Sequence, residues 1–302
     1  MEDKLKEIKE KHTEKKFGAW YDNKYKLLLV ISMLLMISCF VYLGIFYSHH
    51  GDIMYKDVTL SGGTSITVYG QANIKELEAA LKDFNPVIRQ LSELQTGRQI
   101  GFAIESTASI EQIKPALEKF LGYTLTDKNS SVESTGATLS KSFYKELIIA
   151  LIIAFILMSV VVLISFRTFI PSIAVMQAAL VDMLVPLVFM DIIGYRISTA
   201  GIAAFLMMVG YSIDTDIMLT NRALRRKELQ INERLWLAFK TGVTMSLAAF
   251  GAVFSAYLIV SRFSALLSEV FLILSIGALT DILTTWLGNA AILKWYCEKK
   301  NI

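Results

Sequence analysis

Six long apolar stretches dominate the pattern of hydrophobic and polar positions along this 302-residue chain. Each holds about 20 residues, which is enough to cross ~30 Å of hydrocarbon as a helix that rises ~1.5 Å per residue. The stretches are Leu27–Phe46, Leu147–Phe166, Ile170–Met190, Ile197–Leu219, Lys240–Val260 and Leu266–Leu293. The sequence therefore predicts a polytopic α-helical membrane protein with six transmembrane helices.

The segment between the first two stretches has the pattern of a small folded domain. Helical spacing of apolar residues occurs twice, 36 positions apart, at Ile74, Leu77, Leu81 and Phe84 and at Ile110, Ile113, Leu117 and Phe120. Asn73 and Ser109 occupy the N-cap positions of these helices. Strand patterns precede each helix and also follow the second one, at Val58–Tyr69, Gln99–Glu105, Tyr123–Thr126 and Ser131–Ser134. This order predicts an α+β ferredoxin-like external domain.

The resulting organisation has five parts. They are a charged N-terminal tail (1–26), transmembrane helix 1 (27–46), the external domain (47–146), transmembrane helices 2–6 (147–293) and a short tail (294–302). The first tail carries eight Lys residues, and the Thr220–Trp236 loop is also rich in basic residues. By the positive-inside rule, we expect both termini to be cytoplasmic and the domain between spans 1 and 2 to lie outside.

Composition adds that 54% of residues are hydrophobic, and against this background five charged residues inside the spans stand out. Asp182 and Asp281 fall near the middle of the third and sixth spans, whereas Asp214 and Asp216 lie near the cytoplasmic end of the fourth. Lys240 enters the fifth span from that same side. A charge at such depth costs roughly 2.5–3.5 kcal/mol on insertion scales and is usually functional or paired.

Depth matching predicts a pair between Lys240 and one of the two neighbouring acids, since Lys240 lies about 7 Å and Asp214 about 8 Å inside the membrane boundary. Asp214 and Asp216 are separated by about 200° around a helix, so only one can face Lys240. Of the two, we favour Asp214 as the primary charge carrier. For the whole set, a charge or proton pathway is favoured over the alternative in which the acids only join spans together.

Several enzyme classes lack the residues that they need. The three histidines, His12, His49 and His50, all lie outside the spans, which excludes an intramembrane serine–histidine protease and a His-rich metal site. The acids have no G-x-G-D context, and no G-x-x-x-x-G-K-[ST] phosphate loop occurs. We therefore expect no enzymatic activity, no cofactor and no metal.

Two motifs together resemble the SecF family of protein-export membrane proteins, in the SecD/SecF branch of the resistance-nodulation-division superfamily. The first motif, similar to D-F-x-G-G-T, includes Asp57, Gly62, Gly63 and Thr64. The second, similar to G-Y-S-x-N-D-T, includes Gly210, Tyr211, Ser212, Asp214, Thr215 and Asp216, with Arg222 following. The layout of one span, a large loop and five further spans agrees with that family. The glycines of the first motif are expected to allow a bend or a close backbone approach.

The second motif departs from the common bacterial pattern and looks like the archaeal branch. An ungapped match puts the charge-carrying Asp of the family at Thr215, between Asp214 and Asp216. Lys240 stands where the family has an Arg, and a buried Lys can lose its proton whereas Arg does not. The assignment of the primary charge carrier by resemblance is therefore open by one residue.

The resemblance implies an auxiliary subunit of the Sec translocase that assists protein export across the cell membrane by using the proton gradient. Its implied partners are SecD, the SecY translocation channel complex, the exported polypeptide and the lipid bilayer, with no nucleic acid. Six spans of this pattern form half of a pseudo-symmetric transporter, which also calls for a second half. Two alternatives stay open: a small-molecule or ion exporter of the resistance-nodulation-division type, and a passive scaffold of the Sec channel.

Overall fold

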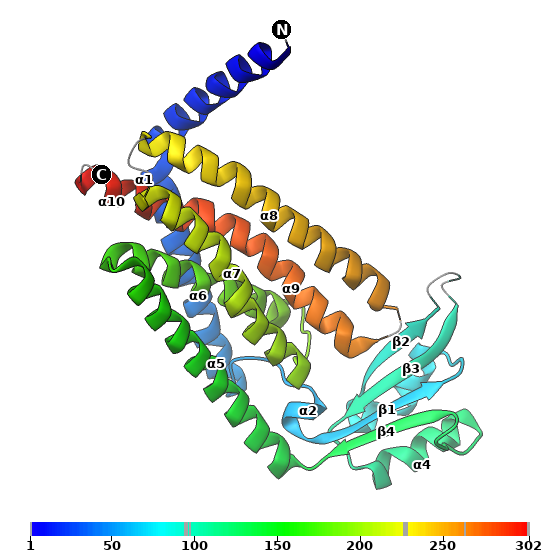
Figure 1. Cartoon of the computed structure of the whole chain (residues 1–302). Coiled ribbons are helices and arrows are strands. Elements are labelled where there is room, and N and C mark those ends of the chain that lie inside the picture. Colours follow the sequence, from blue (N-terminus) through cyan, green and yellow to red (C-terminus); the bar gives the residue numbers. More distant parts are fainter. Residues whose placement is uncertain (1, 94–95, 97, 226–228, 263, 301–302) are drawn as a thin grey trace.

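The computed structural model is a helical bundle with a small sheet domain at one end (Figure 1). It describes residues 2–93, 96, 98–225, 229–262 and 264–300. The long helices are α1 (Glu2–His50), α5 (Ala137–Phe166), α6 (Phe169–Ile192), α7 (Thr199–Arg225), α8 (Ile231–Val260) and α9 (Ala265–Thr284). A π-helical turn, Thr285–Asn289, joins α9 to α10 (Ala290–Lys300). The N- and C-termini lie at the end of the bundle opposite the sheet domain.

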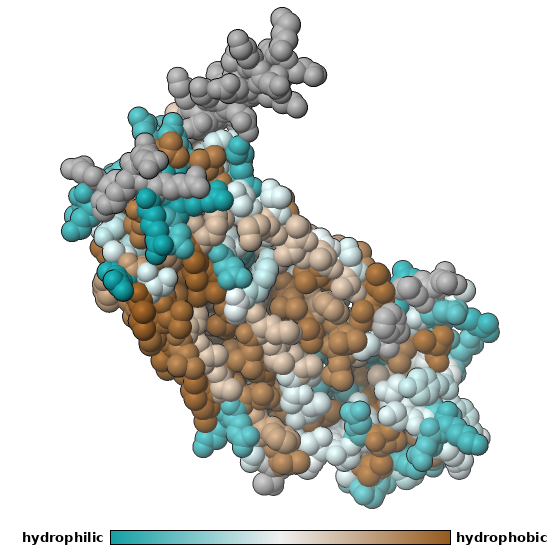
Figure 2. Space-filling view, viewed as in Figure 1, coloured by the Kyte–Doolittle hydropathy of each residue, from teal (hydrophilic) through white to brown (hydrophobic). Residues whose placement is uncertain are grey.

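The prediction of six spans is confirmed within the described residues. Six helices are long and apolar enough to cross a membrane, the sixth running through α9 and α10. Apolar side chains cover the middle of the bundle, whereas polar side chains gather at its two ends (Figure 2). Leu157 and Ile164 of α5, for example, are exposed despite their large apolar side chains. This distribution is the one expected of helices that face lipid.

The helix boundaries differ from those expected from hydropathy alone. The tail and the first span form the one continuous helix α1, with no break at residues 26–27. Helix α5 begins at Ala137, ten residues before Leu147, because polar residues extend it beyond its apolar part. Hydropathy detects the part of a helix that lies in hydrocarbon and does not detect its polar extension.

The sheet domain has the order β1 (Gly63–Tyr69), α3 (Ile74–Ala80), β2 (Val87–Ser92), β3 (Gln99–Ser106), α4 (Ile110–Leu121) and β4 (Ser130–Thr135). Its four strands are antiparallel and lie in the order β2-β3-β1-β4. The predicted ferredoxin-like arrangement is therefore confirmed. Both helices cover one face of the sheet, where Ile66, Phe102 and Ile104 pack against Leu77 and Ile113.

Two local predictions for this domain were wrong, and one strand was missed. Val58–Ser61 forms the short helix α2 instead of the start of a strand, because the Asp57 carboxylate caps the backbone N–H of Thr59 at 2.8 Å. Tyr123–Thr126 forms no strand. The backbone N–H groups of positions 125 and 126 donate to the side chains of Glu118 and Asn129 and are therefore not available to a neighbouring strand. Strand β2 went unnoticed in the sequence. The two predicted N-caps, Asn73 and Ser109, are confirmed.

Helix α1 is attached to the rest of the bundle by a buried lysine that sequence analysis missed. Lys294 of α10 is only 1% exposed, and its ammonium group forms ion pairs with Asp22 of α1 and, at 3.1 Å, with Glu298. It also donates to Asn232 Oδ1 of α8 at 2.6 Å. The partners satisfy the buried charge, as such groups require. Three helices therefore meet at this lysine.

Glycine at position 63 is required by both backbone conformation and space. Its φ is +143°, and a Cβ there would meet the backbone of Ser106 and Thr107 on the neighbouring strand and its continuation. We expect Gly63→Ala to destabilise the sheet domain by about 1–3 kcal/mol. Gly136→Ala is the matched control, because Gly136 has open space around its Cβ position and an ordinary φ of −66°. Thermal unfolding in detergent measures the difference, and equal midpoints for the two variants would contradict the assignment.

Candidate functional site

Three aspartates from three different helices converge inside the bundle. They are Asp182 of α6, Asp216 of α7 and Asp281 of α9, and each is 0% exposed. Helix α9 packs against both α6 and α7, which brings their carboxylates to one level of the bundle. We refer to these residues as the aspartate cluster.

Asp182 accepts two hydrogen bonds from hydroxyl groups of neighbouring helices. Ser212 of α7 donates to its Oδ2, and Thr284 of α9 donates to its Oδ1 at 2.5 Å. Both hydroxyls lie within a helical turn or so of another acid of the cluster. The contacts of Asp182 thus connect it to the two helices that carry Asp216 and Asp281.

Asp216 and Asp281 share a hydroxyl group. Thr285 Oγ1 lies 3.0 Å from Asp216 Oδ1 and 3.5 Å from Asp281 Oδ1. The Asn289 amide also donates to Asp216 Oδ1, at 2.7 Å. The second oxygen of Asp216, Oδ2, is buried and has no hydrogen-bond partner among the described residues. A buried carboxylate oxygen without a hydrogen-bond partner can bind a proton or accept a hydrogen bond from a partner protein.

On its other side, Asp281 contacts helix α8. Ser246 donates to Asp281 Oδ2 at 2.8 Å, and the Ser246 hydroxyl lies 3.5 Å from that of Thr215. All of the hydrogen-bond donors described for the three aspartates are neutral hydroxyl or amide groups. Hydroxyls both donate and accept, so they can reorient when a carboxylate gains or loses a proton.

The π-helical turn lies directly at this cluster. Its backbone N–H to C=O bond runs from Ala290 to Thr285, which widens the helix by one residue. Thr285 and Asn289, the first and last residues of the turn, both contact Asp216. Turns of this kind are rare and frequently occur at functional sites.

Asp214 and Asp216, two positions apart in the sequence, point to different sides of α7 in the structure. Asp216 is buried in the cluster, whereas Asp214 is exposed on the outer face of α7. This agrees with their predicted separation around the helix. Thr215 is buried beside Ser246, and Lys240 is half-buried on α8. The hydrogen bonds described for Asp216 come from Thr285 and Asn289, not from Lys240.

The remaining residues of the second motif lie on α7 around the cluster. Ser212 belongs to it directly, whereas Tyr211 is half-buried and Gly210 is exposed. Arg222 lies near the end of α7 and donates from Nη1 to the Leu237 carbonyl at 2.6 Å and to Thr241 Oγ1 at 3.0 Å. It therefore joins α7 to α8 at the end of the bundle away from the sheet domain.

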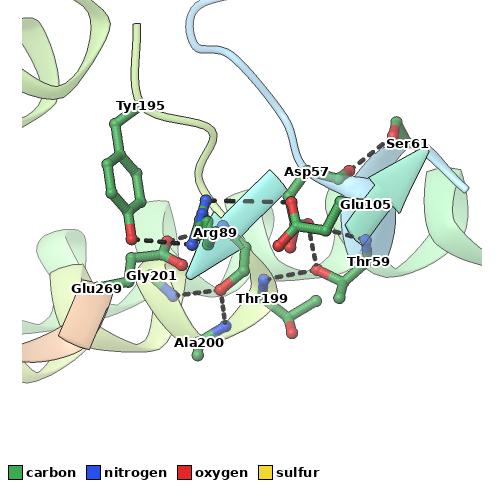
Figure 3. A network of polar contacts seen from close by, with 11 residues as sticks. Asp57, Thr59, Ser61, Arg89, Glu105, Tyr195, Thr199, Ala200, Gly201 and Glu269 are labelled. Atoms are coloured by element: carbon green, nitrogen blue, oxygen red, sulfur yellow. Dashed lines mark hydrogen bonds and ion pairs between the residues drawn. The ribbon is translucent and has the colours of Figure 1, made fainter. Parts of the chain in front are cut away.

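The first motif forms the junction between the sheet domain and the bundle (Figure 3). The Asp57 backbone N–H donates to the Ile197 carbonyl at 3.0 Å, and Ile197 N–H donates to the Tyr55 carbonyl at 2.7 Å. The Thr59 hydroxyl, held by the Asp57 carboxylate, accepts the backbone N–H of Thr199 at 3.0 Å. Residues 55–59 are thus bonded to the start of α7.

Further contacts in this junction come from α9 and from strands β2 and β3. Glu269 of α9 accepts the backbone N–H of Ser198 at 2.8 Å. Arg89 of β2 donates to the Tyr195 hydroxyl at 3.0 Å and lies 4.0 Å from Glu105 of β3. Helices α7 and α9, which carry two of the clustered aspartates, therefore both begin at the sheet domain.

Burial shifts the pKa values of titratable groups in the junction. It raises the pKa of the Asp57 and Glu105 carboxyls above their usual range, and nearby Arg89 offsets part of each shift. Burial also raises the pKa of Tyr195 to about 12. These groups lie between the strands and the bundle, where water has little access.

Sequence analysis identified the three aspartates of the cluster but missed most of the side chains that hold them. The missed residues are Ser246, Thr284, Thr285 and Asn289. Small polar residues are common in membrane helices, so none of them stands out alone. For Thr284, Thr285 and Asn289 the one signal is spacing, since positions 281, 284, 285 and 289 lie on one helical face.

Comparison with known proteins points to a single family. Residues 117–299 match the family described as protein export membrane protein SecD/SecF, C-terminal. The protein-export membrane protein SecF of Methanothermobacter thermautotrophicus is 44% identical over 175 residues, which cover 57% of this chain and 61% of the relative. SecF of Methanocaldococcus jannaschii is 32% identical and is matched over 90% of this chain and 95% of the relative.

Solved structures share the fold at low sequence identity. The crystal structure of SecDF, a translocon-associated membrane protein from a Thermus species, is similar with a TM-score of 0.69 and 17% identity. The similarity covers 93% of this chain but only 38% of the SecDF chain. A second SecDF structure, in a super-membrane-facing form, gives a TM-score of 0.58. The bundle and its sheet domain thus correspond to somewhat more than a third of that longer protein.

The different exposure of the two neighbouring aspartates can be tested by cysteine labelling. In detergent, Asp214→Cys is expected to react with a maleimide many times faster than Asp216→Cys, because only the first side chain is exposed. The native Cys39 and Cys297 are buried and give a low background. Labelling rates followed by mass spectrometry measure the ratio. Equal rates at the two positions would overturn the orientation of α7.

Proposed function

The chain belongs to the SecF family of protein-export membrane proteins, and we propose that it is an accessory, non-catalytic subunit of Sec-dependent export that is driven by the proton gradient. The observation that carries this proposal is the aspartate cluster. Three carboxylates held by neutral donors cannot all stay charged in a dry site without a large energetic cost. We propose that the number of protons they bind responds to the proton gradient across the membrane.

Within the cluster we propose Asp216 as the primary carrier, in place of Asp214. Asp216 has one oxygen without a described partner, and its other oxygen contacts the π-helical turn. Protonation there would change the hydrogen bonds to Thr285 and Asn289 and hence the geometry of that turn. Asp182 and Asp281 then act as neighbouring carriers joined through hydroxyl groups.

The proposed output is movement of the sheet domain. Helix α7 carries Asp216 and begins at the junction, where Thr199 is bonded to Thr59. Helix α9 carries Asp281 and contributes Glu269 to the same junction. A shift of either helix along its axis would thus reach the sheet through hydrogen bonds rather than through a flexible linker.

Asp214 fits a different role, at the contact with a partner. It is exposed on the same face of α7 as Ala203, Met207 and Gly210. The other residues of this face are small or flexible, and Asp214 is the one carboxylate among them. A charge on such a face calls for a neighbouring helix. We propose SecD as that partner, with the SecY channel complex and the exported polypeptide as further contacts in the cell membrane. The termini are then cytoplasmic and the sheet domain outside.

The other candidate functions have less support. A small-molecule exporter would need a roomy apolar chamber, whereas the cavity beside the sheet has a volume of about 230 Å³ and includes carboxylates and hydroxyls in its walls. A passive scaffold would not require three buried carboxylates on three helices. Both alternatives make distinct predictions for neutral variants of the cluster.

Neutral variants test the coupling directly. We expect Asp216→Asn, alone or combined with Asp214→Asn, to abolish the part of export that depends on the proton gradient, because the cluster loses its titrating carboxylate. Membrane insertion should be retained by both variants, and co-purification with SecD should be retained by Asp216→Asn alone. The assay is translocation of a preprotein into vesicles, with and without an uncoupler. Asp127→Asn, on an exposed turn of the sheet domain, is the control.

The outcomes separate the three functions. Full, uncoupler-sensitive export by the double variant would refute coupling through this site. Full export that does not respond to the uncoupler in either protein would favour a scaffold. Transport of a dye by the purified chain and its partner, without any effect on preproteins, would favour a small-molecule exporter.

A further inference from the structure

A cavity of about 230 Å³ lies between the sheet and the end of the bundle. Its floor is the sheet face opposite α3 and α4, and its walls come from the start of α2 and the start of α9. The Asp57 side chain borders it on the bundle side. The sheet residues that line the cavity do not belong to the aspartate cluster.

The register of the strands explains why this floor is polar. Ser65 of β1 pairs with Glu105 of β3 on one side and with Glu133 of β4 on the other, so these three side chains form a row on one face. With neighbouring strands about 4.8 Å apart, the two glutamates flank Ser65 at roughly 10 Å from each other. In the next row, Thr67 pairs with Ser131. Hydroxyls therefore lie between and beside the two carboxylates.

The cavity carries an excess of negative charge. Asp57, Glu105 and Glu133 line it, and Glu269 is close behind the junction. The positive groups that face Glu105 are Arg89 and Arg196, of which Arg89 is already bonded to the Tyr195 hydroxyl.

Glu105 gives the independent sign of a missing ligand. Its side chain is only 10% exposed, yet its Oε2 atom accepts no hydrogen bond from the described residues. Arg89 Nη2 forms a long ion pair with this atom at 4.0 Å, beyond hydrogen-bond distance. Figure 3 shows Glu105 close to both Asp57 and Arg89. Buried carboxylate oxygens normally accept at least one hydrogen bond, so this atom lacks a hydrogen-bond donor.

We propose that this cavity binds a basic side chain, a guanidinium or ammonium group, of a polypeptide. Such a group would donate to Oε2 of Glu105, which accepts no hydrogen bond from the described residues, and to Glu133. Its apolar stem would lie against Leu91 and Leu266 in the same cavity. The site extends the proposed function, since it assumes that the sheet domain meets polypeptide during export.

The dimensions of the cavity favour this ligand over a metal ion. No group of three or more His, Cys, Asp or Glu side chains among the described residues is close enough to hold a metal. The two glutamates flank a serine instead of converging on a point, and the volume exceeds what one ion needs. A long side chain with several N–H donors can span this spacing, and Arg presents five such donors.

Peptide binding to the full chain in nanodiscs of neutral lipid tests the proposal. The probe is a fluorescent, unstructured Gly/Ser peptide with one central Arg, compared with the same peptide carrying citrulline, which has nearly the same shape without the charge. We expect the Arg peptide to bind at least about fivefold more tightly. Glu133→Gln should weaken the Arg peptide about threefold to fivefold and leave the citrulline peptide unchanged. Fluorescence anisotropy measures all four affinities.

Two further variants complete the experiment. Glu78→Gln removes an exposed carboxylate of α3 on the other side of the sheet and should have no effect. Glu105→Gln should weaken Arg binding more than Glu133→Gln, with circular dichroism as the check that the domain is folded. Equal affinities for the Arg and citrulline peptides, or equal effects of Glu78→Gln and Glu133→Gln, would overturn the proposed site. Binding of both peptides alike would still leave the export function intact.

Discussion

The bundle is organised around the need to keep three carboxylates inside hydrocarbon, where no bulk water can hydrogen-bond to them. Side chains from neighbouring helices meet this need, and each donor is a hydroxyl or an amide. Such donors hold a carboxylate in place without cancelling its charge. The hydrogen bonds hold the cluster in position, and we propose that it still exchanges a proton, which a set of tight salt bridges would prevent.

The helices that carry the aspartates are also hydrogen-bonded at the junction with the sheet domain. Helices α7 and α9 carry Asp216 and Asp281. Helix α7 begins with a hydrogen bond to Thr59, in the segment that precedes β1, and Glu269 of α9 bonds to Ser198 just before α7. The connection uses main-chain groups, such as the bonds that join Ile197 to Tyr55 and Asp57. Main-chain bonds of this kind limit independent movement of the two parts. The junction thus makes the sheet a rigid extension of the helices that hold the acids.

Much of this architecture could be predicted from sequence, because membrane spans and a ferredoxin-like domain have strong periodic signals. The close backbone approach at Gly63 was also foreseeable, whereas the capping role of Asp57 was not. The partners of the acids were not, since Thr285 and Asn289 gain their meaning only from a π-helical turn that no local pattern announces. Depth matching paired Lys240 with the nearest acids, but it could not tell which acid faces inward. That depends on how α7 is rotated against α6 and α9, and packing alone decides it.

The central claim is that the aspartate cluster changes protonation when export is driven by the gradient. Infrared difference spectroscopy on the complex in proteoliposomes, with isotope-labelled aspartate, tests it most directly. Our account predicts carboxyl signals that change when a proton gradient is imposed and that disappear in Asp216→Asn. Carboxyl signals that stay constant while gradient-driven export proceeds would contradict it.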